Sequence, residues 1–207
     1  MEQTVNEERW NALSHGFGAA LGILGLFVLI HFDTGKSEFS TFSIVLYSFS
    51  MIVLFLSSTI YHAVSNKHLK NVFRKLDHIS IYLLIAGTYT PIALITLEKG
   101  SGWTIFWVVW SIAIAGTVLK IFFTGRFDKL SLLLYLFMGW LIVFDLQSLL
   151  SFMSEPALYL MMAGGAFYTL GTIFYAIERI PYNHVIWHFF VLGGAISHYF
   201  MVLLEVA

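Results

Sequence analysis

Two histidines near the end of the sequence have the spacing of metal ligands on one helix. His184 and His188 are four residues apart, at the front of a stretch that is otherwise almost wholly apolar. Residues four apart share one face of an α-helix, so both imidazoles would point the same way. Because burying an unpaired polar side chain is costly, the pair indicates either a bound metal ion or hydrogen bonds to a loop.

A third histidine, His62, is expected in the same layer of the molecule. Ser58 and His62 are also four apart, at the end of another long apolar stretch. Two imidazoles from one helix and one from a facing helix make three nitrogen ligands, and three protein ligands with one open position describe a catalytic zinc site. Imidazole also suits copper, iron and nickel. The spacing therefore predicts a metal site, with zinc as the ion that fits best.

Other polar residues near this layer have both a functional and a structural interpretation. Asp77 is either part of the site or a carboxylate that is favourable at the positive end of a helix dipole. His78 is an alternative ligand, but it points about 100° away from Asp77 around a helix. A further set follows the spacing i, i+3 and i+7, which suits either a helix cap and anchor or a support for the site: Glu8, Asn11 and His15.

The remaining histidines are expected outside the site. His198 lies ten residues beyond His188, which is roughly 15 Å along a helix, so one metal ion cannot bind both. We interpret His198 as a buried polar residue that lines a cavity. His68 lies in a basic loop and is expected to be solvated, and His31 lies at the far end of the first helix. Asp145, near the far end of the fifth helix, receives no role.

The elements that position these residues are long apolar segments. Of the 207 residues, 58% are hydrophobic and only 11% are charged, whereas soluble domains carry about 25% charged residues. A helix that spans a bilayer needs roughly 20 apolar residues. Seven blocks reach this size, and the one at 130–154 is interrupted by Asp145 while the others have no charged residue: 10–32, 39–66, 78–97, 100–119, 130–154, 156–177 and 180–204.

The sequence therefore predicts an all-α membrane protein with seven transmembrane helices in a single domain, residues 1–207. The expected helices lie at about 11–31, 41–63, 77–97, 103–123, 130–151, 157–177 and 184–205. The acidic, polar start does not resemble a signal peptide, so the first helix is expected to be a retained span. The chain has no cysteine, which excludes disulfides and thiolate-bound zinc. A net charge of −1 does not indicate a nucleic-acid partner.

The distribution of basic residues predicts the orientation in the membrane. Nine of the eleven Lys and Arg fall on the side that holds the N-terminus, and only Lys36 and Lys99 fall on the other. Cytoplasmic loops carry the excess of Lys and Arg, so the N-terminus is expected inside and the C-terminus outside. With this topology the first, second, third and seventh helices place their ionisable residues in one layer at the cytoplasmic side.

Taken together, the motifs resemble the signature of the progestin and adiponectin receptor family. They are ERWNALSH at 8–15, SSTIYH at 57–62, KLDH at 75–78, HVIWH at 184–188 and SH at 197–198. Within that family the chain is most similar to the bacterial branch called hemolysin III, and the alkaline ceramidases are more distant relatives. The resemblance covers nearly the whole chain, because it includes the seven expected helices and has motifs in the first, second, third and seventh of them.

The resemblance implies a zinc site near the cytoplasmic face. The residues that match the family's ligands are His62, His184 and His188. The matching aspartate, Asp77, would hold the water at the zinc, and the matching serine, Ser58, would lie close to the metal.

The resemblance also implies a choice of functions. The eukaryotic relatives are proposed ceramide hydrolases or hormone receptors, and the bacterial branch is named for red-cell lysis and linked to membrane homeostasis. We expect a zinc-dependent hydrolase of a membrane lipid amide or ester in the cell membrane, with Asp77 as the base and Ser58 as a donor to the oxyanion. The alternatives are a lipid-sensing, receptor-like protein with a structural zinc, and a lytic protein.

Overall fold

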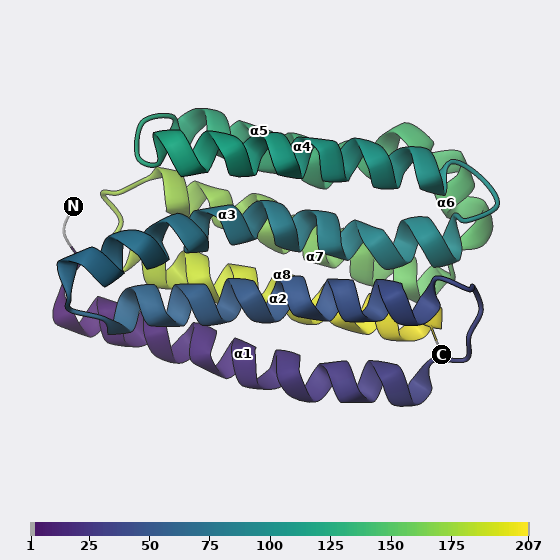
Figure 1. Ribbon diagram of the computed structural model, residues 1–207, viewed down its shortest axis with the longest axis horizontal. Coiled ribbons are helices and arrows are strands. Elements are labelled where there is room, and N and C mark those ends of the chain that lie inside the picture. Colours follow the sequence, from purple (N-terminus) through teal and green to yellow (C-terminus); the bar gives the residue numbers. More distant parts are fainter. Residues whose placement is uncertain (1–2, 207) are drawn as a thin grey trace.

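The protein is a bundle of seven long helices that run up and down along one axis (Figure 1). The computed structural model describes residues 3–206, which contain helices and no strands. Within these residues, seven spans are long and apolar enough to cross a membrane. The elements are α1 Val5–Phe32, α2 Ser40–Ala63, α3 Lys67–Pro91, η1 Ile92–Thr96, α4 Gly102–Phe123, α5 Asp128–Trp140, η2 Leu141–Asp145, α6 Leu146–Phe152, α7 Glu155–Ala176 and α8 Asn183–Val206. The predicted seven-helix class is confirmed, and the single-domain organisation stays a prediction.

Two of the spans change helix type inside the bundle. The third continues beyond Pro91 as the π-helical turn η1, where the proline has no N–H to donate along the helix. The fifth consists of α5, the 3-10 turn η2 and α6. The Tyr89 hydroxyl donates to the Gly139 carbonyl at 3.0 Å and accepts from the Ile142 N–H at 2.9 Å. This side chain of α3 therefore holds the point at which α5 becomes η2.

The first helix begins about a turn and a half earlier than the sequence predicts, at Val5 instead of about residue 11. Its start is a capping box. The Glu7 N–H donates to Thr4 Oγ1 at 3.3 Å, and the Thr4 N–H donates to Glu7 Oε2 at 2.7 Å. As a result the polar residues that precede the apolar block are helical and belong to the bundle.

The third helix also begins early, at Lys67 instead of about residue 77. The Asn66 side chain caps it by accepting from the N–H groups of His68 and Leu69, at 3.0 and 3.1 Å. Asp77 therefore lies well inside α3. The interpretation of Asp77 as a carboxylate at a helix N-terminus is wrong, because the positive end of the dipole acts only within the first turn.

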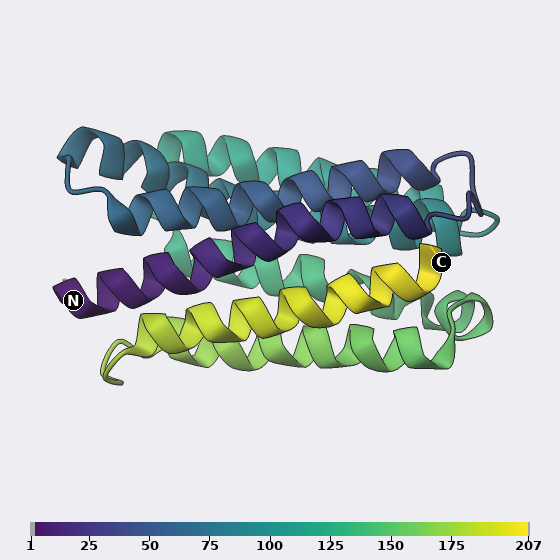
Figure 2. The same ribbon diagram turned by 90° about the horizontal axis from the view of Figure 1, so that it is seen from below.

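The spans are buried to very different extents. The most apolar windows of α2 and the third span are 56% and 61% buried, whereas those of the fifth span and α7 are only 17% buried. The main core is formed largely by side chains of α2 and α8. Figure 2 shows α1 beside α8, and α8 beside α7. The bundle thus has a closely packed half around α2 and α3 and a more open half at α5 and α7.

Polar contacts fix the end of α8 that lies opposite the N-terminus. Glu205 accepts from the Thr96 hydroxyl at 2.8 Å, and from the Ser154 hydroxyl and N–H at 3.0 and 3.2 Å. The N–H and hydroxyl of Thr34 donate to the Val206 carbonyl at 3.1 and 2.9 Å. These bonds tie α8 to the π turn, to the start of α7 and to the α1–α2 loop.

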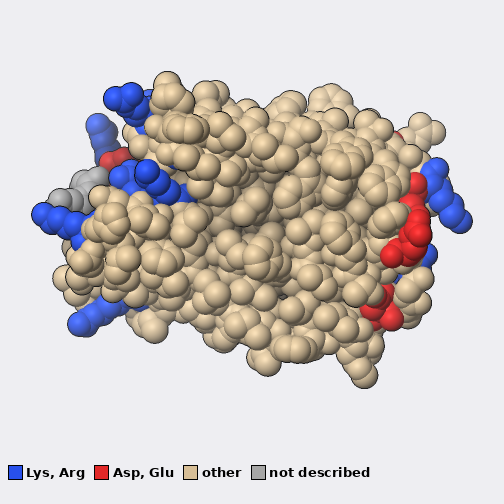
Figure 3. All heavy atoms as spheres, in the orientation of Figure 1, with Lys and Arg blue, Asp and Glu red and all other residues tan. Residues whose placement is uncertain are grey.

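The charged residues lie at the two ends of the bundle. In Figure 3, Lys and Arg gather at the end that holds the N-terminus, and most of the acidic residues shown lie at the other end. The surface between the ends exposes large apolar side chains such as Phe27, Trp107 and Phe144. With seven spans of this length, the chain is an integral membrane protein.

Candidate metal centre

The three histidines that the sequence suggests as metal ligands converge in the structure. His62 lies in the last turn of α2, and His184 and His188 lie in the first two turns of α8. One ring nitrogen from each lies within 4.8 Å of the other two. The ring centroids are 4.7 Å apart within α8, and His62 is 5.2 Å from His184 and 4.9 Å from His188. The spacing argument therefore selected residues that share one place.

The chemistry of this cluster fits a metal ion. His62 is 4% exposed and His188 is 2% exposed. The Nε2 atoms of His62 and His184 are buried, and neither has a hydrogen-bond partner among residues 3–206. A buried nitrogen without a partner is unfavourable, and a cation bound by the imidazoles would satisfy it. Zinc prefers such ligands, and copper, iron and nickel also accept them.

The first helix, which carries none of the three histidines, contacts two of them. His62 Nδ1 donates to Glu8 Oε2 at 2.7 Å, and His188 Nδ1 donates to the Asn11 carbonyl at 3.3 Å. The His15 ring is stacked on His188, with 3.6 Å between centroids and 13° between the planes. Of the two interpretations of this polar face, support of the histidine cluster agrees with the contacts.

Glu8 also connects the cluster to the third helix. Its second oxygen, Oε1, accepts from Lys70 Nζ at 2.9 Å, and the same ammonium donates to the Tyr61 carbonyl at 3.1 Å. The Glu8 side chain is 24% exposed, so this end of the cluster reaches the surface. One carboxylate thus links α1, α2 and α3.

Ser58 and Asp77, the two residues expected to act on the substrate and water, face the same layer. Ser58 is fully buried one turn before His62 on α2. The Asp77 side chain on α3 is 16% exposed. His62 and Ser58 are among the polar groups close enough to affect the electrostatic environment of its carboxyl group. The residues that could hold one metal ion together are the three histidines, without Ser58 or Asp77.

His78, the alternative ligand, is turned away from the cluster. Its Nδ1 donates to the Arg74 carbonyl at 2.7 Å, one turn back on α3. The same nitrogen is 3.8 Å from the Asp77 carboxylate. His78 therefore contacts its own helix and the neighbouring aspartate instead of the other imidazoles.

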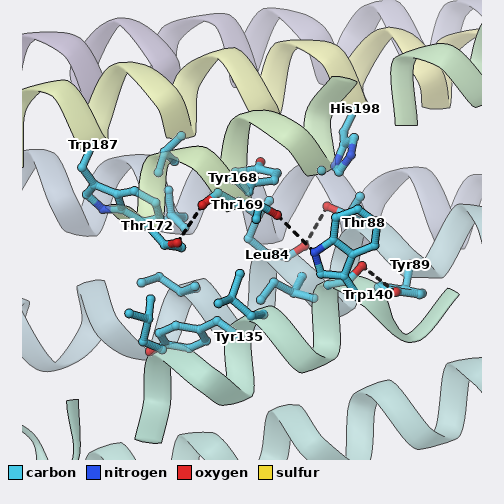
Figure 4. Close-up of a pocket in the computed structure, with 18 residues that line it drawn as sticks. Leu84, Thr88, Tyr89, Tyr135, Trp140, Tyr168, Thr169, Thr172, Trp187 and His198 are labelled. Atoms are coloured by element: carbon cyan, nitrogen blue, oxygen red, sulfur yellow. Dashed lines mark hydrogen bonds between the residues drawn. The ribbon is translucent and has the colours of Figure 1, made fainter. Parts of the chain in front are cut away.

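An apolar cavity is lined mainly by side chains of α3, α5, α7 and α8 (Figure 4). Its volume is about 110 Å³, and Trp187 and His198 both line it. Several of its lining residues, among them Tyr89 and Trp140, also line a larger apolar cavity of about 400 Å³. As expected, His198 lines both, and its Nε2 donates to the Met161 carbonyl at 3.2 Å.

A polar cavity lies on the other side of the cluster, at the end that holds the N-terminus. Its volume is about 420 Å³, and its lining includes His184, Glu7, Arg179 and Asn183. His184 therefore borders the polar cavity, and Trp187, next to His188 in the sequence, borders the apolar one. The sequence predicted a cavity at His198 but not the polar cavity at His184.

Comparisons with known proteins find relatives over nearly the whole chain. Residues 3–199 match the family model described as haemolysin-III related. Hemolysin-3 of Bacillus cereus is 44% identical over 207 residues, which cover 100% of this chain and 94% of that protein. The Hemolysin-3 homolog of Bacillus subtilis (strain 168) is 43% identical over 201 residues, or 97% and 94% of the two chains. The human Monocyte to macrophage differentiation factor is 29% identical over 208 residues, or 96% and 84%.

Proposed function

Because this chain belongs to the haemolysin-III related family and folds as a seven-helix membrane protein, we propose that it is a zinc-dependent hydrolase of a membrane lipid amide or ester. The observation that carries the proposal is the convergence of His62, His184 and His188, with His184 in the wall of a polar cavity and Trp187, on the same helix, in the wall of an apolar one. Lipid hydrolysis needs this arrangement, because the acyl chain must stay in apolar surroundings while water reaches the bond to be cleaved. The proposed role is membrane homeostasis in the cell membrane.

The three histidines would hold the zinc through imidazole nitrogens. Zinc supplies Lewis acidity in such a site and lowers the pKa of water from about 15.7 to about 7. Asp77 would accept the proton that the attacking water loses, as a general base. The Ser58 hydroxyl would donate a hydrogen bond to the carbonyl oxygen as it gains negative charge, and such a donor typically stabilises the transition state by about 3 kcal/mol.

The acyl chain would lie in the apolar cavity, whose wall includes Trp187 and His198 of α8. Leu84 and Val191 contribute to its wall. The polar part of the lipid would face the cavity at His184, where charged side chains and water are available. The bond between the polar head and the acyl chain of the lipid would then lie at the depth of the three histidines.

The test is turnover of lipid by the purified, zinc-loaded protein in vesicles that contain ceramides, phospholipids and acylglycerols. We expect the parent to release fatty acid. Asp77→Asn should keep its zinc and lose about 10²–10⁴-fold in rate, because the amide cannot act as the base. Asp145→Asn is the matched control: Asp145 accepts from Ser101 near the far end of the bundle, so its loss should leave the rate unchanged.

A zinc-loaded parent that cleaves none of these lipids would contradict the hydrolase and favour a lipid-sensing protein with a structural zinc. An Asp77→Asn variant that folds, binds zinc and turns over lipid at the parental rate would contradict the base. Melting temperatures of all three proteins separate loss of rate from loss of fold.

We also propose that the N-terminus, and with it the histidine layer, faces the cytoplasm. Nine of the eleven Lys and Arg lie at that end (Figure 3), and the positive end of a membrane protein faces inward. Alkaline phosphatase fused after residue 207 should therefore be active outside the cytoplasm. Green fluorescent protein fused at the same position and exported by the same route should not fluoresce. The opposite pair of signals would contradict this orientation.

A further inference from the structure

The first helix presents hydrogen-bond acceptors to two of the candidate metal ligands. Glu8 Oε2 lies 2.7 Å from His62 Nδ1, and the Asn11 carbonyl lies 3.3 Å from His188 Nδ1. Glu8 and Asn11 are three residues apart, so they lie on the same face of α1. One helix therefore contacts ligands on two different helices, α2 and α8.

These acceptors determine which ring nitrogen carries the proton. A neutral imidazole has one N–H donor and one acceptor nitrogen. A carboxylate and a backbone carbonyl only accept, so each requires its histidine to be protonated at Nδ1. The lone pair is then on Nε2. In His62 this Nε2 is buried and has no hydrogen-bond partner in the described part of the chain.

We propose that Glu8 is a positioning residue that holds His62 in the metal-binding tautomer and orientation, with Nε2 directed towards the other two histidines. This inference rests on the metal site proposed above. A carboxylate bonded to the second nitrogen of a metal-bound histidine fixes the ring and increases the basicity of the ligating nitrogen. The 2.7 Å distance is that of a charge-assisted hydrogen bond.

Glu8 also has a structural role, from which positioning must be separated. The Lys70 ammonium donates to Oε1, whereas His62 donates to Oε2. The side chains of this ion pair are 31% and 24% exposed, and exposed ion pairs contribute little to stability. Because the two partners use different oxygens, the ion pair can be removed while the bond to His62 remains.

The experiment measures the zinc affinity of the purified full chain by competition with a chromophoric chelator, together with the melting temperature of the metal-free protein. Glu8→Gln keeps the size of the side chain but introduces an amide that can donate as well as accept, so it no longer selects one tautomer. We expect zinc to bind about 10–100-fold more weakly to this variant. The melting temperature of its metal-free form should fall no further than that of Lys70→Met, which also loses the bond to the Tyr61 carbonyl.

Two control variants complete the design. Lys70→Met removes the ion pair and leaves the Glu8–His62 bond, so it should bind zinc as the parent does. Glu7→Gln removes the adjacent carboxylate of the same helix, which bonds Thr4 and no histidine, and it should also bind zinc as the parent does.

Equal loss of zinc affinity in Glu8→Gln and Lys70→Met would mean that Glu8 only ties helices together, and the inference would be wrong. Parental affinity in Glu8→Gln would overturn the inference alone and leave the metal site standing. A parent that binds no zinc would overturn the proposed function as well.

Discussion

Two histidines on α8, ten residues apart, have opposite surroundings. His188 is stacked on His15 and lies close to His62 and His184, so imidazoles from three helices meet around it. The ring nearest to His198 is that of Tyr168, with 5.4 Å between centroids, and its position is the wall of an apolar cavity. A histidine within a membrane span can therefore act as a metal ligand only where other helices place further ligands at the same depth.

The two positions also differ in how the backbone makes room for the ring. His188 is surrounded by side chains that extend from α1 and α2 towards α8. His198 instead packs directly on Gly164 of α7, where an added Cβ would overlap the ring. Space for His198 thus depends on a missing side chain, whereas the place of His188 depends on polar partners.

The sharpest test of the comparison, with the largest expected effect, is the loss of each ring in turn. His188→Ala removes one of the three proposed ligands, so we expect zinc to bind more than about 100-fold more weakly, beyond the usual effect of changing an outer partner. His198→Ala should keep the zinc content of the parent. The measurement is zinc per chain by atomic absorption after dialysis of the purified proteins.

Equal zinc in His188→Ala and the parent would break the comparison, because both histidines would then be equally remote from the metal. Loss of zinc in His198→Ala with an unchanged melting temperature would likewise place a ligand where we find only a cavity wall.

A smaller effect is expected from filling the space beside His198. Gly164→Ala adds a methyl group that must displace the ring, and overpacking of this kind typically destabilises by about 1–3 kcal/mol. At about 2–4 °C per kcal/mol for a chain of this size, the melting temperature should fall by several degrees. Gly165→Ala is the matched control, since nothing lies within 4 Å of its added Cβ.

Zinc content should stay at the parental level in both glycine variants, because the displaced ring is not a ligand. Loss of zinc in Gly164→Ala but not in Gly165→Ala would show that the apolar cavity at His198 and the histidine cluster are coupled. The two regions could then no longer be treated as separate.

The convergence of the three histidines could be predicted from the sequence because it depends only on order and spacing. The apolar blocks alternate in direction, so the end of the second and the start of the seventh must lie at the same side, and the spacing of His184 and His188 selects one face. The contact of Glu8 with His62 could not be predicted in this way. It depends on the rotation of α1 about its own axis, which the pattern of apolar residues in that helix does not fix.

The starts of α1 and α3 were misplaced for an identifiable reason. Charged residues ended the apolar blocks, but they did not end the helices. For α1 a signal was present in the sequence, since Thr4 followed by Glu7 at the third position is the pattern of a capping box. For α3 the Asn66 cap was a weaker signal, because Asn is also common in turns. Apart from His198, the cavity walls had no sequence signal, because they combine side chains from several helices.

The hydrogen bond between His188 and the Asn11 carbonyl joins residues 177 positions apart, and this separation has a consequence for biosynthesis. Chains are synthesised at about 5–20 residues per second. The polar face of α1 is therefore synthesised about 9–35 seconds before its partner on α8. Zinc that requires ligands from α2 and α8 together would have to arrive after that interval, so metal loading would follow insertion of the seventh span.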